Sequence, residues 1–259
     1  MPEFTDNLDL FRSGDHHNIL LRTFDVGPDV PCNQHLIIHG REAMLLDPGG
    51  HKLYAKVFSV TRKALGKAKL KHLFLSHQDP DIVAATNGWL MALPELQAWC
   101  SELWRRFVPH IGPNHLLFTR MKGIPDGGGR IPLGDSEVWI IPAHFLHSSG
   151  NFHVYDPTSK VLYTGDLGAS LGEDYREVTD FDAHVRYMKG FHERYMGSTR
   201  ALKLWLGLVR QLDIQTIAPQ HGAMFIGPEM VGRFLDWMDS LEVGVDQLKP
   251  YEVPEAVLL

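Results

Sequence analysis

Short apolar runs, separated by turn residues, alternate along the chain with segments in which apolar residues recur at helical spacing. Apolar runs of about four to eight residues bounded by turn residues are typical of strands. This pattern predicts strands over residues 18–25, 34–39, 43–47, 71–75, 97–100, 136–141, 150–155, 160–164 and 214–218. The helical spacing predicts helices over residues 53–65, 82–93, 102–107, 184–212 and 228–245.

The order of the predicted elements indicates the fold class. Strands followed by helices occur in each half of the chain, which favours two sheets packed face to face and covered by helices. Residues 151–156 and 160–164 are joined by Pro157-Thr158-Ser159, a connection typical of an antiparallel hairpin. The chain is therefore predicted to be an α/β (α+β) protein with two mixed sheets, folded as a single domain over residues 1–259.

Polar clusters follow four of the predicted strands. Strands that end at one edge of a sheet would bring such clusters together, and imidazole and carboxylate groups are good metal ligands. The sequence therefore predicts a site for two metal ions at that edge. Its candidate ligands are three histidines and three aspartates, namely His77, Asp79, Asp81, His147, Asp166 and His221.

The first of these clusters is predicted to reach both metal ions. Pro80 suits the first turn of a helix. A tight turn at this proline can direct the carboxylates of Asp79 and Asp81 toward different cations.

The later clusters leave alternatives open. Asp166 follows a glycine that allows a sharp backbone turn, so its two carboxylate oxygens could bridge two cations; a turn or helix-capping aspartate is the alternative. His144 competes with His147 for the same strand end. We favour His147 as the ligand and expect His144 to hydrogen-bond a ligand instead.

Composition narrows the function classes. The chain has 259 residues, 44% of them apolar, and a formal charge of −6, which disfavours nucleic-acid binding. Its apolar runs are too short to span a membrane, and its N-terminus lacks the pattern of a secretory signal. The only cysteines are Cys32 and Cys100, which favours a reducing cytoplasm. The 15 histidines are many for this length, and metal binding is one reason for them.

Charge counting favours redox-active metals. Three neutral imidazoles and three carboxylates supply −3, so two ferrous ions (+4) leave +1 and two ferric ions (+6) leave +3. A bridging oxo, hydroxo or peroxo group could neutralise the surplus of the oxidised pair. Ligand sets that mix carboxylates with histidine suit iron or manganese better than the softer sets that zinc prefers.

At these residues the chain resembles the metallo-β-lactamase superfamily. Hydrolases of this superfamily carry H-x-H-x-D-H, whereas the matching stretch here is His77-Gln78-Asp79-Pro80-Asp81-Ile82. An acid in place of the second histidine is similar to the H-x-E-x-D pattern of flavodiiron proteins. Gly165-Asp166-Leu167-Gly168 with Gly172, and Pro219-Gln220-His221-Gly222, also match that branch.

The resemblance implies an αββα sandwich with a binuclear site at the rim between the sheets. It implies that one iron is held by His77, Asp79, His147 and Asp166. It implies that the other iron is held by Asp81, Asp166 and His221, so that Asp166 is the bridge.

Three departures from the family pattern change the expected function. Asp79 stands where the family has glutamate, and Ile82 replaces a histidine that often follows Asp81, so the second iron is expected to keep an open position beside an apolar neighbour. No flavodoxin-like domain or flavin-binding loop is apparent, so no flavin is expected in this chain. The chain then looks like a stand-alone oxygen-binding di-iron protein that works with a separate redox or signalling protein. Whether it forms a homodimer is left open.

The first functional hypothesis is that the di-iron centre binds or reduces dioxygen. Tyr195 and His192, one helical turn apart, are predicted to line the pocket and hydrogen-bond a bound oxygen species, unless this helix face only packs on the sheet. The alternative function is a di-zinc hydrolase of a thioester, lactone or phosphodiester, with a metal-bound hydroxide as nucleophile. A third option is a sensory or scaffolding module with structural metals.

Overall fold

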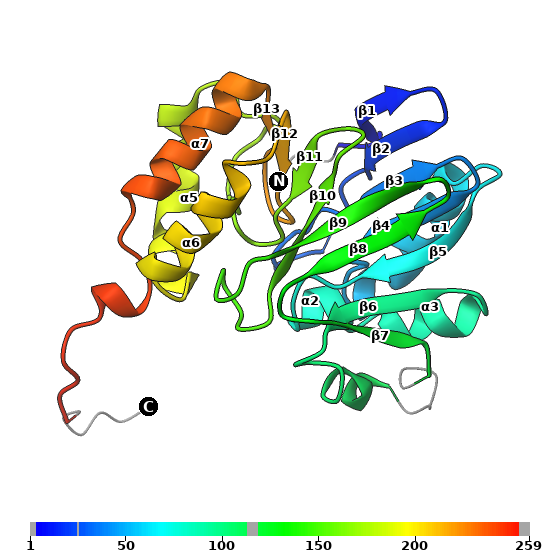
Figure 1. The fold of residues 1–259 in the computed structure, drawn as a ribbon, viewed down its shortest axis with the longest axis horizontal. Helices are drawn as coiled ribbons and strands as arrows, with labels where there is room; N and C mark the ends of the chain where they lie inside the picture. The colour runs from blue at the N-terminus through cyan, green and yellow to red at the C-terminus, as the bar shows by residue number, and fades with distance from the viewer. Residues whose placement is uncertain (1–3, 25, 113–118, 254–259) are drawn as a thin grey trace.

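Two β-sheets pack face to face and helices cover both outer faces, which makes four layers (Figure 1). The computed structural model describes residues 4–24, 26–112 and 119–253. The layers are those of the αββα sandwich predicted from the sequence. No helix of the described residues is long and apolar enough to cross a membrane.

The first sheet contains the N-terminal strands in chain order. Its first four strands are antiparallel, and the strands from β4 onward are parallel. The seven strands are β1 (Leu8–Ser13), β2 (His16–Leu20), β3 (His35–His39), β4 (Glu42–Leu46), β5 (Lys69–Phe74), β6 (Gln97–Ser101) and β7 (Met121–Ile124).

The second sheet has the order β13-β12-β11-β10-β9-β8. Strands β8 to β11 pair as antiparallel neighbours, which includes the predicted hairpin, whereas β12 lies parallel to β11. The six strands are β8 (Gly129–Leu133), β9 (Ser136–Pro142), β10 (Phe152–Asp156), β11 (Val161–Tyr163), β12 (Thr216–Ala218) and β13 (Phe225–Ile226).

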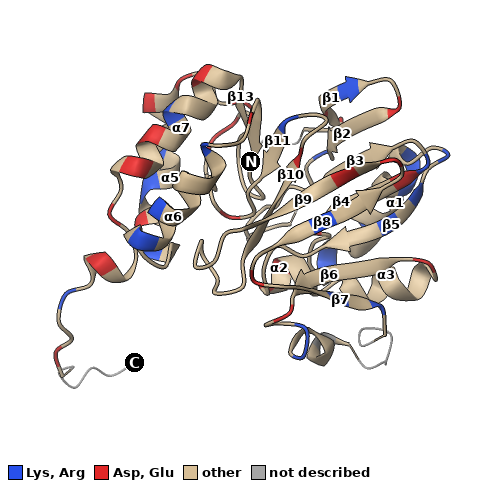
Figure 2. Ribbon diagram, in the orientation of Figure 1, with Lys and Arg blue, Asp and Glu red and all other residues tan. Residues whose placement is uncertain are grey.

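Each sheet has its own layer of helices (Figure 1). The first sheet packs against α1 (Tyr54–Ala64), α2 (Pro80–Val83) and α3 (Thr86–Ala92). The second sheet packs against α5 (Phe181–Tyr195), α6 (Thr199–Val209) and α7 (Pro228–Ser240). The described residues also form three short 3-10 helices, η1 (His51–Leu53), η2 (Val108–Ile111) and η3 (Val245–Gln247). Acidic and basic residues are interspersed along α5 and α7, whereas the charged residues of α6 are all basic (Figure 2).

The continuous apolar runs of the strands follow from burial on both faces of each sheet. Successive side chains of a strand point to opposite faces. In β3, Ile37 joins the core between the two sheets, while Leu36 and Ile38 join the core beneath α1 and α3. The second outer core packs beneath the other helices around Trp205 and Phe234.

The long helix predicted over 184–212 is two helices in the structure. The helices α5 and α6 are separated by Met196-Gly197-Ser198. Ser198 is the N-cap of α6, and its side chain accepts a hydrogen bond from the Ala201 amide at 3.2 Å. Serine is a preferred N-cap residue, so the helix start was visible in the sequence but overlooked.

Other predicted boundaries also differ. The helix predicted over 82–93 is divided into α2 and α3, residues 102–107 form turns, and the last helix ends at Ser240. The strand predicted over 18–25 covers only His16–Leu20, and its predicted end at Asp25 lies outside the described residues. Strands β7, β8 and β13 were not predicted, because they are short or contain glycine or proline. Strand β1 was not predicted either, since its sequence Leu-Asp-Leu-Phe-Arg-Ser does not alternate regularly and its pairing has an irregularity between Asp9 and Phe11.

Candidate metal centre

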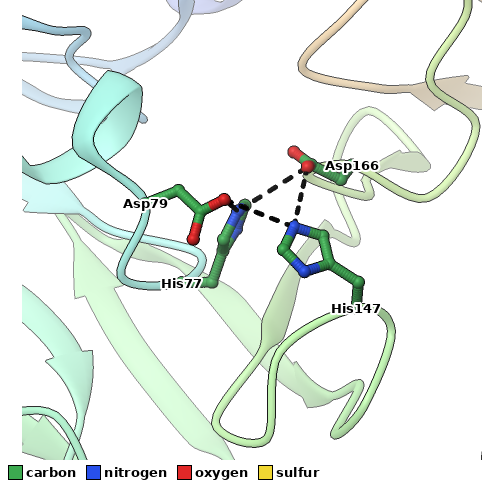
Figure 3. Close-up of side chains that lie close together, drawn as sticks. All are labelled: His77, Asp79, His147 and Asp166. Atoms are coloured by element: carbon green, nitrogen blue, oxygen red, sulfur yellow. Dashed lines mark hydrogen bonds and ion pairs between the residues drawn. The ribbon is translucent and has the colours of Figure 1, made fainter. Parts of the chain in front are cut away.

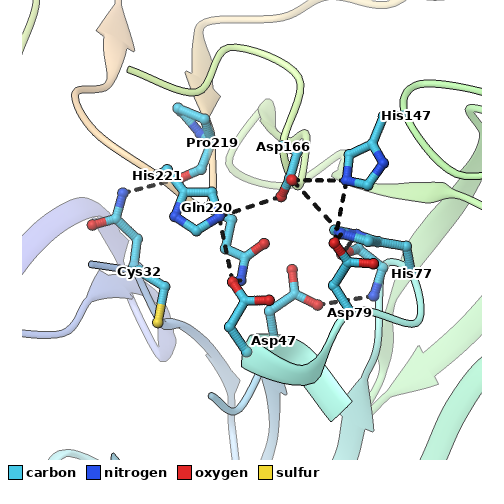
Figure 4. Close-up of polar contacts among 12 residues, drawn as sticks. Cys32, Asp47, His77, Asp79, His147, Asp166, Pro219, Gln220 and His221 are labelled. Atoms are coloured by element: carbon cyan, nitrogen blue, oxygen red, sulfur yellow. Dashed lines mark hydrogen bonds and ion pairs between the residues drawn. The ribbon is translucent and has the colours of Figure 1, made fainter. Parts of the chain in front are cut away.

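The six predicted ligands meet at one rim of the sandwich, and each follows a strand. All of them except Asp81 are labelled in Figure 4. Three of them come from the first sheet, and the other three come from the second. After β5 come His77, then Asp79 as the N-cap of α2, then Asp81 in the first turn of α2; after β9, β11 and β12 come His147, Asp166 and His221.

Local sequence explains how the two neighbouring acids separate. Asp79 has extended backbone (φ −65°, ψ 147°), and Pro80 begins the helix that carries Asp81. The chain therefore changes direction between the two carboxylates. Gly165 has φ 51°, and a Cβ there would lie 3.2 Å from Ser76 Oγ, so a glycine suits the turn that aims Asp166 inward.

Four of the side chains form the first half-site, defined as His77, Asp79, His147 and Asp166 (Figure 3). His147 Nε2 lies 3.0 Å from Asp166 Oδ2 and 3.6 Å from Asp79 Oδ2. His77 Nε2 lies 3.7 Å and 3.6 Å from the same two oxygens. One ligand atom from each side chain falls within 4.8 Å of all the others, so one cation could contact all four.

The second half-site consists of Asp81, Asp166 and His221. His221 Nε2 lies 3.5 Å from Asp166 Oδ1 and 3.5 Å from Asp81 Oδ2 (Figure 4). Asp166 thus turns Oδ2 to the first half-site and Oδ1 to the second. This is the arrangement that a bridging carboxylate requires.

Neighbouring groups hold the imidazoles in orientations suited to metal binding. His221 Nδ1 donates to the Pro31 carbonyl at 2.7 Å, so Nε2 is the ring nitrogen that faces the half-site and becomes a ligand atom once it loses its proton. His77 Nδ1 lies 3.0 Å from Ser76 Oγ. Gln220 donates to Asp81 Oδ2 at 3.4 Å.

Two of the candidate ligand atoms are buried without a hydrogen-bond partner among the described residues, His77 Nε2 and Asp166 Oδ1. Buried polar atoms of folded proteins nearly always have a partner. Both atoms point into the half-sites, where a cation would satisfy them. The donor set of imidazole nitrogens and carboxylate oxygens therefore fits a pair of divalent metal ions.

The electrostatics of the centre also favour cations. Burial alone would raise the pKa of Asp166, but the imidazoles of His77, His147 and His221 hold it well below its ordinary value. Burial lowers the pKa of His221, but the nearby Asp166 carboxylate, together with the Pro31 carbonyl and Asp81, outweighs burial and raises it to about 9. The carboxylates thus create a strong negative potential, which a proton or a metal ion can neutralise.

Comparison with known proteins identifies the family. The family model described as ODP family beta lactamase matches residues 30–222. The chain belongs to this family. No curated protein sequence matches the chain.

Solved structures agree with this family. A structure described as the peroxy di-iron species of the chemotaxis sensor ODP is 37% identical, with a TM-score of 0.83 over 93% of this chain and 97% of that one. The apo state of the chemotaxis sensor ODP from T. denticola has the same identity and coverage, with a TM-score of 0.82. Rubredoxin oxygen:oxidoreductase from Desulfovibrio gigas is 15% identical, with a TM-score of 0.74 over 86% of this chain and 58% of that one. The last likeness shows a shared fold.

A largely apolar cavity of about 570 Å³ opens onto the centre of this ODP-family chain. Tyr195, which was predicted to line the pocket, is one of its walls, and its ring lies 5.9 Å from the ring of His147. The lining includes Val30, Leu53, Leu171, Phe191 and Tyr195 beside Asp79, Asp81, Asp166 and His221. An apolar molecule can reach both half-sites by this route.

His192 does not line this cavity, unlike the sequence prediction. Its ring is fully buried, Nε2 accepts a hydrogen bond from the Gly168 amide at 2.8 Å, and Nδ1 donates to the Met188 carbonyl at 2.8 Å. Burial lowers the pKa of His192 to about 4, so the ring is neutral. His192 therefore supports the loop that carries Asp166, two residues before Gly168.

Two further expectations are changed by the structure. Ile82 is fully buried in the core beneath α1 and α3 and does not line the cavity, so it is not the apolar neighbour of an open metal position. His144 Nε2 bonds the Asp126 carbonyl at 2.8 Å rather than a predicted ligand.

Sequence reasoning overlooked Asp47. This buried carboxylate accepts a hydrogen bond from the Ser76 amide at 2.8 Å, and so holds the residue before His77 in place. Burial raises the pKa of Asp47 to about 6. Asp47 directly follows the apolar strand β4, the same signal that identified the metal ligands.

Proposed function

We propose that this chain holds two iron ions in the two half-sites and binds dioxygen there, as an oxygen sensor or as an oxygen reductase that uses a separate electron donor. The observation that carries this proposal is Asp166, whose two oxygens face separate groups of imidazole and carboxylate ligands. When bound, a pair of ferrous ions can supply two electrons to dioxygen.

The carboxylates, the imidazoles and the apolar walls of the cavity have different roles at the centre. Asp79 and Asp81 add negative charge on opposite sides of Asp166, which favours cations over other ligands. His77, His147 and His221 offer imidazole nitrogens as ligand atoms, and a metal binds the unprotonated nitrogen of an imidazole. The apolar walls around Tyr195 favour a small uncharged molecule over anions.

Similarity to the chemotaxis sensor ODP favours sensing over turnover. That protein is 37% identical and covers nearly the same length of chain, and one of its structures is described as a peroxy di-iron species. Sensing requires a partner that receives the signal, so the proposal includes a separate signalling or redox protein. It leaves open whether the chain forms a homodimer. A cytoplasmic location is also proposed, and the two buried cysteines, neither of them in a disulfide, are consistent with it.

Metal analysis and oxygen titration test the proposal together. Protein from iron-replete cells, purified without oxygen, should hold about two irons per chain, as in other two-metal sites. Titration with oxygen should then raise a visible absorption band that fades when oxygen is removed, if binding is reversible. Zinc alone in the protein, together with thioester or lactone turnover and no oxygen-dependent band, would favour the hydrolase instead.

A further inference from the structure

The loop that carries His147 is bound to the junction between α5 and α6. The Gly197 amide donates to the Phe145 carbonyl at 2.7 Å. The contact is close: a Cβ at Gly197 would lie 2.7 Å from Phe145 Cβ and 2.9 Å from its carbonyl oxygen. Only glycine permits this approach, so the two backbones are held at a fixed separation.

The other side of the same junction is bound to a C-terminal turn, defined here as residues 243–248. The Val245 amide donates to the Gly197 carbonyl at 3.0 Å, and the Gly244 amide donates to the Glu193 carbonyl at 2.9 Å. A Cβ at Gly244 would overlap the carbonyl oxygens of Met196 and Gly197. The turn therefore packs backbone to backbone on the junction.

Side-chain bonds reinforce this contact. Asp246 Oδ2 accepts from the Thr199 amide at 2.6 Å, and Thr199 Oγ1 accepts from the Val243 amide at 3.0 Å. The turn thus holds the first residue of α6, directly after the junction. Gly197 lies between two backbone hydrogen bonds, one to Phe145 and one from Val245.

The conformation of the His147 loop needs such support. Phe145 has φ 65°, in the left-handed region that an aromatic residue rarely adopts, and its amide donates to the Ser148 carbonyl at 2.7 Å. Phe145 is also 53% exposed, so little side-chain burial stabilises it. Within the loop, the Asn151 side chain donates to the Leu146 carbonyl at 2.7 Å. The bond from Gly197 adds a tie from α5 and α6 to Phe145, two residues before His147.

We propose that the C-terminal turn positions His147 through Gly197 and Phe145, and thereby couples the metal centre to the C-terminal segment of the chain. Coupling of this kind is reciprocal. If the turn stabilises the conformation of His147 that binds metal, metal binding must stabilise the turn by the same free energy. The inference rests on the proposed metal centre but not on iron or on oxygen.

Cobalt(II) is a suitable probe, because it binds imidazole and carboxylate groups and its visible spectrum reports their geometry. Gly197→Ala should weaken cobalt binding by about tenfold, as expected when a group that orients a ligand is disturbed, and should alter the visible spectrum. Gly190→Ala is the matched control: Gly190 lies within α5, and a Cβ there would meet nothing within 4 Å. The control should leave affinity and spectrum unchanged.

A pair of truncations tests the turn itself. Ending the chain after Val243 removes the bonds made by Gly244, Val245 and Asp246, whereas ending it after Leu248 keeps them all. The shorter chain should bind cobalt about tenfold more weakly, and the longer one like the full chain. Equal affinity in the two truncations would overturn the proposal.

Hydrogen exchange on the full chain makes the test independent of any variant that folds poorly. Cobalt loading should slow exchange of the Gly197 and Val245 amides, because the turn opens less often when His147 is held by metal. Unchanged exchange at both amides would overturn the proposal. Absence of iron or of an oxygen response would count against the proposed function alone, since cobalt binding requires neither.

Discussion

At the scale of single residues, Asp166 is the group on which the centre depends. Its side chain is 7% exposed, and its two oxygens face different half-sites. No other described residue lies within ion-pair distance of His77, His147 and His221 together. Loss of this one carboxylate therefore affects both cations.

Asp166→Ala should bind neither metal ion, and Asp166→Asn should bind both weakly, because the amide keeps the shape but lacks the charge. Metal analysis after loading with ferrous iron and desalting without oxygen gives the occupancy. Asp156→Asn offers a control, since Asp156 is equally buried but bonds His16 and Asn18 instead. Full occupancy of both half-sites in Asp166→Ala would show that it is not the bridge.

A second residue-scale prediction concerns pH. His153 is fully buried, its Nδ1 accepts from Trp205 Nε1 at 3.0 Å, and burial lowers its pKa to about 3. Because the unfolded chain takes up this proton first, the stability due to neutral His153 is complete above pH 6.5 and is lost as pH falls toward 3.

The variant His153→Gln keeps an acceptor for the indole but does not titrate. Between pH 7 and pH 5 the wild type should therefore lose about 2 kcal/mol more of its free energy of unfolding than this variant. Urea unfolding at the two pH values measures the difference. The same loss in both proteins would mean that His153 is not the buried base responsible.

At the scale of elements, α5 forms a wall between the centre and solvent. The rings of Phe191 and Tyr195 stack on this helix with their centroids 4.6 Å apart, and both rings face His147. Tyr195 is 57% exposed, so it stands at the mouth of the cavity. A small molecule that reaches the metal centre through the cavity therefore passes the rings of Phe191 and Tyr195.

Tyr195→Ala should therefore speed oxygen release by a few-fold, because it removes part of the wall over His147. Tyr195→Phe keeps the ring, so any change in Tyr195→Phe measures the predicted hydrogen bond from the hydroxyl. Stopped-flow absorbance on the oxygenated protein gives the rates. Identical release from wild type and Tyr195→Ala would mean that oxygen leaves by another route.

The elements also show which features sequence could predict. The ligands were predictable because each follows an apolar strand, and strands of a packed sheet end at a shared rim. The break at Gly197 could be predicted only in part: Ser198 is a typical N-cap, but both flanking helices have apolar residues at helical spacing, and only tertiary contacts fix the angle between them. The burial of Ile82 could not be predicted either, since it depends on the orientation of α2 on the sheet.

At the scale of the whole molecule, the centre joins the two halves of the sandwich. His77, Asp79 and Asp81 follow a strand of the first sheet, and the other three ligands follow strands of the second. Without metal, like charges of the three carboxylates face one another across this rim, and the imidazoles of His77, His147 and His221 lie between them. Bound cations would cross-link the two sheets as well as supply chemistry.

Metal binding should therefore raise the free energy of unfolding of the entire chain. An ion that binds only the folded state stabilises it by about 2.7 kcal/mol when present at one hundred times its Kd. Thermal unfolding with and without a chelator should show a single transition that moves to lower temperature when metal is removed. Asp166→Ala should unfold at one temperature in both conditions, because it has no bridging ligand. A chelator effect of equal size in this variant would place the stabilising metal elsewhere, and two separate transitions in the wild type would show that the halves unfold independently of the centre.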